Sequence, residues 1–439
     1  MTIEFLLGLL GLIAVFMPVA ASLVMGLLWL FGIELAEATI HRITATTFSI
    51  SLAACLGILA AIVARPGAST IVTLAHWVVV PSYALEARFV FDLPAGVLMT
   101  LTALLCGLIG VFSAPYLHLD PGFRRFFVLL PLFAAGMMAI AAGDTLDLVY
   151  AGWEVVGIAS ALLIAYFNER EAPVRHGLRA FAVYRVCDVA LLAAAVLMHH
   201  HAHDPSLGMG VRLEGGAGLT IALLLVFASM GKAAAFPFTG WLPRAMEGPT
   251  PSSAIFYGAL SIHAGPFLLL RSWPLLAEHP IARGALIAIG VVTAIHATMV
   301  GRVQTDVKCL LGYASVTQAA VILVEIGLGW TGLALAHMTG HAILRTWQLL
   351  RAPSLLHDHH ELVGLIGGGR PPRGTLWERM LPPRIQRWGY RIALERWFID
   401  DLAANRLLAS LTALFRGLDA LDQRWVEAIS GQRPEEVRR

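Results

Sequence analysis

Residues 219–243 read LTIALLLVFASMGKAAAFPFTGWLP, and this stretch decides the fold. Its first part is apolar enough to enter a bilayer as a helix, yet it carries Lys232. Pro237 then removes a backbone hydrogen-bond donor, and Gly240 and Pro243 add further breaks. Backbone interrupted at membrane depth is tolerated only where it lines a polar cavity, so the sequence predicts a discontinuous membrane helix with Lys232 beside water.

The rest of the chain has the same apolar character. Of 439 residues, 58% are hydrophobic and 14% charged, and the mean hydropathy is +0.73. This is too much apolar surface for a single soluble core. We therefore expect an all-α, polytopic membrane protein with about 11 transmembrane helices. The predicted spans are 5–32, 44–64, 95–115, 126–143, 147–167, 178–198, 219–247 (interrupted), 254–273, 284–301, 308–327 and 331–350.

Composition divides the chain into three regions. Residues 1–94 hold the first spans and, over 67–92, an alternating apolar and polar pattern that predicts an external hairpin or loop. Residues 95–350 form the core of the spans. Residues 351–439 combine a linker with an amphipathic helix that is expected on the membrane surface or against a partner; a solvated tail is the alternative. The apolar stripe of this helix is Trp397, Phe398, Leu402, Leu407, Leu408, Leu411, Leu414, Phe415, Leu418, Leu421 and Trp425.

Charge and cysteine patterns suggest where the protein resides. The first apolar run has no basic region before it and no small-residue cleavage site, so we expect no removable signal peptide. Arginines are more frequent in alternate loops and in the C-terminal tail. This distribution places the N-terminus outside and the C-terminus in the cytoplasm, across the cell inner membrane. The four cysteines have no paired spacing, which argues against a disulfide framework, a metal centre or an iron–sulfur cluster.

Lysine is used sparingly in this sequence. Lys232 and Lys308 are the only lysines, and both lie inside or at the edge of apolar segments, whereas arginine serves on the surface. An ionisable group at membrane depth is costly and marks a functional candidate. Arginine keeps its proton, whereas a desolvated lysine can take up and release one. We therefore interpret both lysines as proton-carrying groups; a structural ion pair at Lys232 is the alternative.

Carboxylates lie in neighbouring spans. Glu154 stands mid-span in the run AGWEVVG (151–157), and a carboxylate near Lys232 would hold that lysine charged until it moved away. Asp188 follows Arg185 by one helical turn on the next span. This pair could compete for Glu154 as a gate, or could be purely structural.

Three histidines, His263, His337 and His341, lie within later spans and could relay protons along a wet path. His337 and His341 share one helix face, but no third ligand lies at a suggestive spacing, so no metal is predicted. The cluster HDHHE (357–361) is interpreted as a proton-collecting mouth or a polar cap, with a metal site as the weaker alternative.

Several motifs occur in one order along the chain. They are RFF (125–127), GWEVVG (152–157), RVCDV (185–189), GKAAAFP (231–237), GPTPSSA (248–254), VQTDVK (303–308) and HMTGHA (337–342). Together they resemble the proton-translocating antiporter-like subunits of respiratory complex I, the NuoL type best. That family also includes Mrp-type antiporter and membrane hydrogenase subunits, and the DabB-type subunits of two-component inorganic-carbon transporters. The resemblance runs from about residue 89 to 368.

The resemblance implies roles for individual residues. Glu154 and Lys232 match the family's central glutamate and lysine, Lys308 a lysine further along the proton path, and His337 and His341 its connecting histidines. Two residues depart from the pattern. Tyr257 stands where histidine is usual, and Arg345 where a titratable lysine is usual, so Arg345 can bias charge but can hardly release a proton. The tail also stands where a full complex I subunit has further spans.

Three functions follow as hypotheses. The first is a proton-conducting subunit, DabB-like, that drives carbon dioxide or bicarbonate capture by a soluble, zinc-containing partner. The second is a proton-pumping subunit of an NADH-quinone oxidoreductase or membrane hydrogenase, among sister complex I-type subunits. The third is a non-conducting scaffold for a soluble enzyme. No dinucleotide loop or cysteine cluster occurs, so no catalytic site, cofactor or nucleic-acid partner is predicted in this chain.

Overall fold

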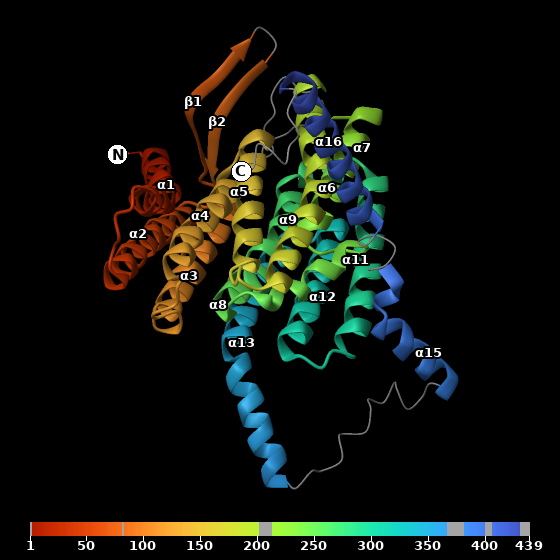
Figure 1. Cartoon of the computed structure of the whole chain (residues 1–439). Coiled ribbons are helices and arrows are strands. Elements are labelled where there is room, and N and C mark those ends of the chain that lie inside the picture. The colour runs from red at the N-terminus through yellow and green to blue at the C-terminus, as the bar shows by residue number, and fades with distance from the viewer. Residues whose placement is uncertain (1, 81–82, 202–212, 367–381, 400–405, 431–439) are drawn as a thin grey trace.

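The protein is described by a computed structural model covering residues 2–80, 83–201, 213–366, 382–399 and 406–430. Within these ranges ten helices are long and apolar enough to cross a membrane, and they stand side by side in a bundle (Figure 1). The protein is therefore a polytopic, all-α membrane protein. The ten spans are α1 (Ile3–Leu30), α2 (Glu37–Ala64), α3 (Leu93–Tyr116), α4 (Phe123–Ala142), α5 (Leu146–Ile164), α6 (Glu171–His201), α7 (Gly215–Lys232), a composite span (Thr250–Arg271), α11 (Pro280–Gly301) and α12 (Val307–Leu328).

The composite span is irregular. It consists of α8 (Thr250–Ser253), a π-helical turn η3 (Ala254–Ala259) and α9 (Ser261–Arg271), and the short α10 (Trp273–Ala277) follows it. A π-helical turn within a helix often occurs at a functional site. This one ends just before His263.

The predicted eleventh span, 331–350, lies in α13 (Thr331–Ile366). This helix is not among the ten apolar ones, because its first half carries two histidines and an arginine. It also runs further than the sequence pattern indicated, projecting beyond one end of the bundle (Figure 1). The helix continues through Pro353, and residues 354–362 after it contain neither glycine nor proline.

Of the predicted hairpin or loop over 67–92, the structure shows the hairpin. Strands β1 (Thr70–Val80) and β2 (Tyr83–Phe91) pair antiparallel, with Thr70 opposite Phe91, and stand off the opposite end of the bundle from the projecting part of α13 (Figure 1). The base of β2 is fixed to the core, because the Asp144 carboxylate accepts from Arg88 at 2.6 Å and the Asp144 amide donates to the Arg88 carbonyl at 3.0 Å.

Short polar side chains set the starts of several spans. The Asp92 carboxylate accepts from the Ala95 amide at 3.0 Å at the start of α3, and Asp306 does the same for Cys309 at 2.8 Å in α12. Such caps each contribute about 1 kcal/mol. Gly329, with φ of 88°, ends α12 in a left-handed conformation that glycine adopts without strain.

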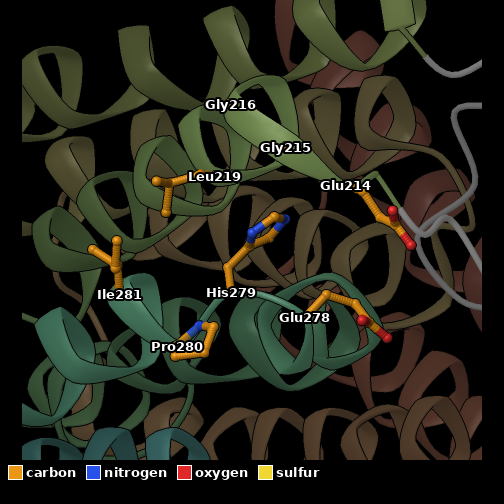
Figure 2. A pocket seen from close by; sticks show the side chains of 8 residues that line it. All are labelled: Glu214, Gly215, Gly216, Leu219, Glu278, His279, Pro280 and Ile281. Carbon is orange, nitrogen blue, oxygen red and sulfur yellow. The ribbon is translucent and has the colours of Figure 1, made fainter.

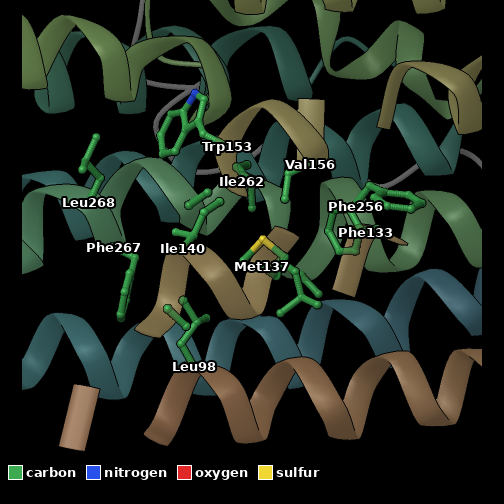
Figure 3. Close-up of a cluster of buried hydrophobic side chains, with 14 of the residues drawn as sticks. Leu98, Phe133, Met137, Ile140, Trp153, Val156, Phe256, Ile262, Phe267 and Leu268 are labelled. Atoms are coloured by element: carbon green, nitrogen blue, oxygen red, sulfur yellow. The ribbon is translucent and has the colours of Figure 1, made fainter. Parts of the chain in front are cut away.

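Small residues let the central helices pack closely. A Cβ on Gly152 of α5 would lie 2.7 Å from the Gly136 carbonyl oxygen of α4, so the two backbones touch there. Lipid is as apolar as a helix surface, and such close contact is therefore a main source of helix association in membranes. Buried rings and aliphatic side chains from α3, α4, α5, η3 and α9 fill the space beside this contact, among them Leu98, Phe133, Met137, Trp153, Phe256 and Phe267 (Figure 3).

The C-terminal tail differs in part from its prediction. It has two described helices, α15 (Pro383–Leu394) and α16 (Arg406–Ser430), with a 3-10 turn η4 (Arg396–Phe398) after α15. The expectation that Trp397 begins the apolar stripe of one long helix was wrong, because Trp397 lies in this turn with φ of 58°. The later stripe residues of α16, such as Phe415 and Trp425, are exposed, so the described residues leave the apolar face of this helix uncovered.

Candidate functional site

Lys232 is the last residue of α7 and lies in the middle of the bundle. Its side chain has no exposed surface, and its Nζ has no hydrogen-bond partner in the part of the chain that the structure describes. Two aromatic rings face it instead. The Nζ lies 4.3 Å from the ring centre of Tyr184 and 5.0 Å from that of Trp153. An ammonium over aromatic faces gains cation–π attraction, which is strongest away from water.

The two predicted carboxylates are bound to Arg185 of α6. Its guanidinium forms an ion pair with Glu154 and donates to the Asp188 carboxylate at 2.7 Å. The Trp153 indole N–H also donates to Asp188, at 2.5 Å. Glu154 and Lys232, which the sequence analysis placed together, form no ion pair here. In this arrangement Arg185 pairs with Glu154, and no carboxylate among the described residues pairs with Lys232.

Glycines bring these side chains together. A Cβ on Gly157 of α5 would lie 3.2 Å from the Lys232 Nζ, so the ammonium rests against bare backbone. A Cβ on Gly231 would lie 2.7 Å from the Cβ of Cys187, which fixes α7 against α6 one residue before the lysine. Both glycines belong to the motifs quoted above, and their lack of a side chain is what allows three helices to meet at Lys232.

The helix break after Lys232 is held by side chains. The Phe236 amide, which has no helical acceptor, donates to Thr293 of α11 at 2.9 Å. The Trp241 indole N–H donates to the Gly231 carbonyl at 3.0 Å. Pro237 leads into two 3-10 turns, η1 (Phe238–Trp241) and η2 (Pro243–Glu247). These turns contain Gly240 and Pro243, so the span is discontinuous where the sequence predicted.

The predicted histidines fall into two contacts. His263 is fully buried, bonds to the Ala259 carbonyl through Nδ1, and has its Nε2 3.0 Å from the Nδ1 of His341. His337, one turn before His341 on α13, contacts Glu325 at 2.9 Å and Gln318 at 3.0 Å, both on α12. The histidines thus link α9, α13 and α12. No group of three metal-ligating side chains occurs among the described residues.

The remaining predicted site residues lie apart from Lys232. Arg345 follows His341 by one turn on α13, is 7% exposed, and has an Nε without a partner. Lys308 is half-buried in the first turn of α12, next to Cys309, whose thiol contacts the Pro243 carbonyl at 3.5 Å. The side chains of Tyr257 and of residues 357–361 lie outside what the structure describes.

Sequence reasoning missed several residues. Tyr184 and Trp153, which face the lysine, were not singled out, although Tyr184 lies one turn before Asp188 on the same helix. Glu325, a carboxylate inside a predicted span, carried the same signal as Glu154 and was overlooked. The Thr239 hydroxyl bonds to His296 at 3.0 Å beside the break, and both of these residues were also missed.

An open pocket of about 350 Å³ lies at the end of α7 opposite Lys232 (Figure 2). Glu214, Glu278 and His279 line it together with apolar and glycine residues, and His279 contacts the Leu213 carbonyl at 2.8 Å. A helix of this length separates the pocket from the lysine by about 25 Å. The pocket therefore belongs to the surface of the bundle, not to the Lys232 site.

A broken helix, a buried lysine and carboxylates bound to an arginine are features typical of ion-translocating membrane proteins. Comparison with known proteins gives the family. The family described as "NADH:quinone oxidoreductase/Mrp antiporter, TM" matches residues 142–365, and "NADH-Ubiquinone oxidoreductase (complex I), chain 5 N-terminus" matches residues 77–127. The chain belongs to the NADH:quinone oxidoreductase/Mrp antiporter family.

Individual relatives agree with this assignment. NAD(P)H-quinone oxidoreductase chain 5 of Synechocystis sp. is 31% identical over 308 residues, which cover 68% of this chain and 45% of the relative. NADH-quinone oxidoreductase subunit L of Mycobacterium tuberculosis is 34% identical over 260 residues, covering 58% of this chain and 41% of the relative. The chain thus spans less than half the length of these two relatives.

Two solved structures share the fold. A chain in the Mrp complex from Dietzia sp. superposes with a TM-score of 0.67 at 24% identity, covering 92% of this chain and 44% of its own length. A chain of the membrane-bound sulfane sulfur reductase, an archaeal respiratory membrane complex, superposes with a TM-score of 0.67 at 16% identity. The match covers 87% of this chain and 77% of that one.

Proposed function

We propose that this chain conducts protons across the membrane, with Lys232 carrying the proton and Arg185 controlling whether Glu154 is available to it. The observation that supports this most directly is the pairing at the site. Arg185 holds both carboxylates, while Lys232, which is fully buried, pairs with no described carboxylate.

The pairing would act as a switch. When Glu154 approaches Lys232, the ammonium is stabilised and the lysine takes up a proton. When Arg185 draws Glu154 away, the buried charge loses its counter-ion, and releasing the proton becomes favourable. The Arg185 and Glu154 side chains are 34% and 19% exposed, so their pair lies nearer the bundle surface than the lysine does. Lys308 and the contacts among His263, His341 and His337 would extend the path, and Arg345 would set the charge beside it.

Reconstitution into liposomes tests conduction. The full-length chain, with any subunits that co-purify, is placed in vesicles containing a pH-sensitive dye, and a potassium diffusion potential drives proton uptake. Lys232→Met should lower the uptake rate by about tenfold or more, because methionine keeps the volume but cannot carry a proton. Arg65→Met, which removes a positive charge from an exposed loop, is the matched control. Equal rates for wild type and Lys232→Met would favour the scaffold hypothesis.

The chain is proposed to work inside a larger assembly in the cell inner membrane, with its N-terminus outside. Two assemblies remain candidates. The relatives named above are subunits of quinone oxidoreductases, which favours a complex I-like pump with sister membrane subunits. An arginine at position 345, where a titratable lysine is usual, favours a DabB-like subunit that feeds protons to a soluble, zinc-containing partner of an inorganic-carbon transporter.

Affinity purification of the tagged chain from native membranes separates these two candidates. Flavin and iron–sulfur proteins with sister antiporter-like subunits in the eluate would support the oxidoreductase assembly. One large soluble protein with bound zinc, detected by mass spectrometry and metal analysis, would support the carbon transporter and exclude the other.

A further inference from the structure

Tyr184 has no part in the switch described above, yet it is in direct contact with Lys232. It lies on α6 one turn before Asp188, and its side chain is completely buried. Its ring centre is 4.3 Å from the Lys232 Nζ, closer than that of Trp153. The Trp241 ring packs edge-on against the Tyr184 ring, with centroids 4.9 Å apart, and this contact fixes the orientation of the tyrosine.

The Tyr184 hydroxyl is the notable feature. Both its oxygen and that of the neighbouring Ser261 hydroxyl are buried and close to each other, and among the described residues neither has a further hydrogen-bond partner. Leaving a buried hydroxyl unsatisfied costs about 1–3 kcal/mol. Buried polar groups of this kind are normally satisfied by ordered water. Two such oxygens side by side favour a short hydrated segment.

This segment adjoins Lys232, which lies against the face of the tyrosine ring. Ser261 is the first residue of α9, and His263 of the same helix contacts His341. No described hydrogen bond joins Lys232 to His263 directly.

We propose that Tyr184 relays protons between Lys232 and His263 through its hydroxyl, with Ser261 and bound water completing the connection. As the tyrosine oxygen accepts a proton from the lysine side, the tyrosine O–H releases its own proton towards Ser261. The phenol therefore stays neutral, and rotation of the new O–H resets it. The ring holds the ammonium in place by its face while the hydroxyl conducts. This inference rests on the proposed function.

Two substitutions distinguish the hydroxyl from the ring. Tyr184→Phe keeps the ring under Lys232 and removes only the hydroxyl, and it should lower proton uptake in the liposome assay by about tenfold. Tyr184→Leu removes both the ring and the hydroxyl, and proton uptake by this variant should be lower still. Tyr313→Phe, which truncates another fully buried tyrosine, on α12, is the control and should conduct like wild type. The solvent deuterium isotope effect on uptake should change in Tyr184→Phe, which loss of packing alone would not cause.

The outcomes separate this inference from the proposed function. Wild-type uptake and isotope effect in Tyr184→Phe, together with loss of uptake in Lys232→Met, would overturn the relay and leave conduction through Lys232 intact. Wild-type uptake in Lys232→Met would instead overturn the proposed function itself. If Tyr184→Phe does not fold, Ser261→Ala decides: reduced uptake supports the relay, and unchanged uptake contradicts it.

Discussion

Arg185 binds two carboxylates at once, and no described carboxylate is left to pair with Lys232. Asp188 is almost fully buried and accepts hydrogen bonds from both the Arg185 guanidinium and the Trp153 indole N–H. It therefore fixes the position of the arginine. Glu154 has one carboxylate oxygen without a partner and is more exposed. Of the two carboxylates, Glu154 is therefore the one that can exchange partners.

Arg185→Gln should hold the site in the state in which Glu154 pairs with Lys232. Without the guanidinium, Glu154 is free to pair with Lys232 and hold its proton, so proton uptake in liposomes should fall by about tenfold. The control is Arg175→Gln on the same helix, where the arginine is exposed and pairs with Glu171 at 3.9 Å. Undiminished uptake in Arg185→Gln would show that the arginine does not gate the lysine.

At the scale of elements, the break after α7 depends on its neighbour α11. The Phe236 amide is an orphan donor created by the end of the helix, and Thr293 accepts from it across the helix interface. Thr293 contacts Phe236, and His296, one turn further along α11, contacts Thr239. The shape of the break is thus fixed from outside its own segment.

Thr293→Val should loosen the break with little change in volume. The Phe236 amide would lose its acceptor, and the free energy of unfolding should fall by about 1–3 kcal/mol. We expect a lower midpoint of thermal unfolding in detergent and slower proton uptake. Thr298→Val on the same helix is the control, because Thr298 makes only an exposed 3.3 Å contact with Thr317. Equal midpoints for the two variants would contradict this role.

At the scale of the whole molecule, the C-terminal tail is fixed to the core beside the break. The Trp397 ring lies 5.1 Å from that of His296 and 5.9 Å from that of Phe236, centre to centre. The turn η4 therefore touches the residues that shape the end of α7. This contact gives any protein that binds the tail a physical connection to the Lys232 site.

Trp397→Ala should release this part of the tail. Aromatic contacts of this kind contribute about 0.5–1.5 kcal/mol, so tryptic cleavage at the arginines of α15 should accelerate by roughly two- to tenfold. Trp388→Ala is the control, because that ring is exposed on α15. Cleavage rates are followed by gel electrophoresis of the purified protein. Equal acceleration in both variants would mean that Trp397 does not hold the tail.

Local patterns in the sequence determined much of this structure. Apolar runs predicted the spans, the alternation over 67–92 predicted the hairpin, and Pro237 predicted the break at the end of α7. Burial of Lys232 and His263 followed from their position within apolar segments. These features depend only on neighbours in the chain, since hydropathy, helix period and proline geometry act over a few residues.

Only the tertiary structure decided which charges meet. Arg185 rather than Lys232 pairs with Glu154, Tyr184 lies against the ammonium, and Trp397 contacts His296. These contacts depend on how helices distant in sequence are rotated against one another. That rotation is set by close contacts such as those at Gly152 and Gly231, where backbones or small side chains of two helices touch. A sequence shows that such glycines exist, but their partners are fixed by packing across the whole bundle.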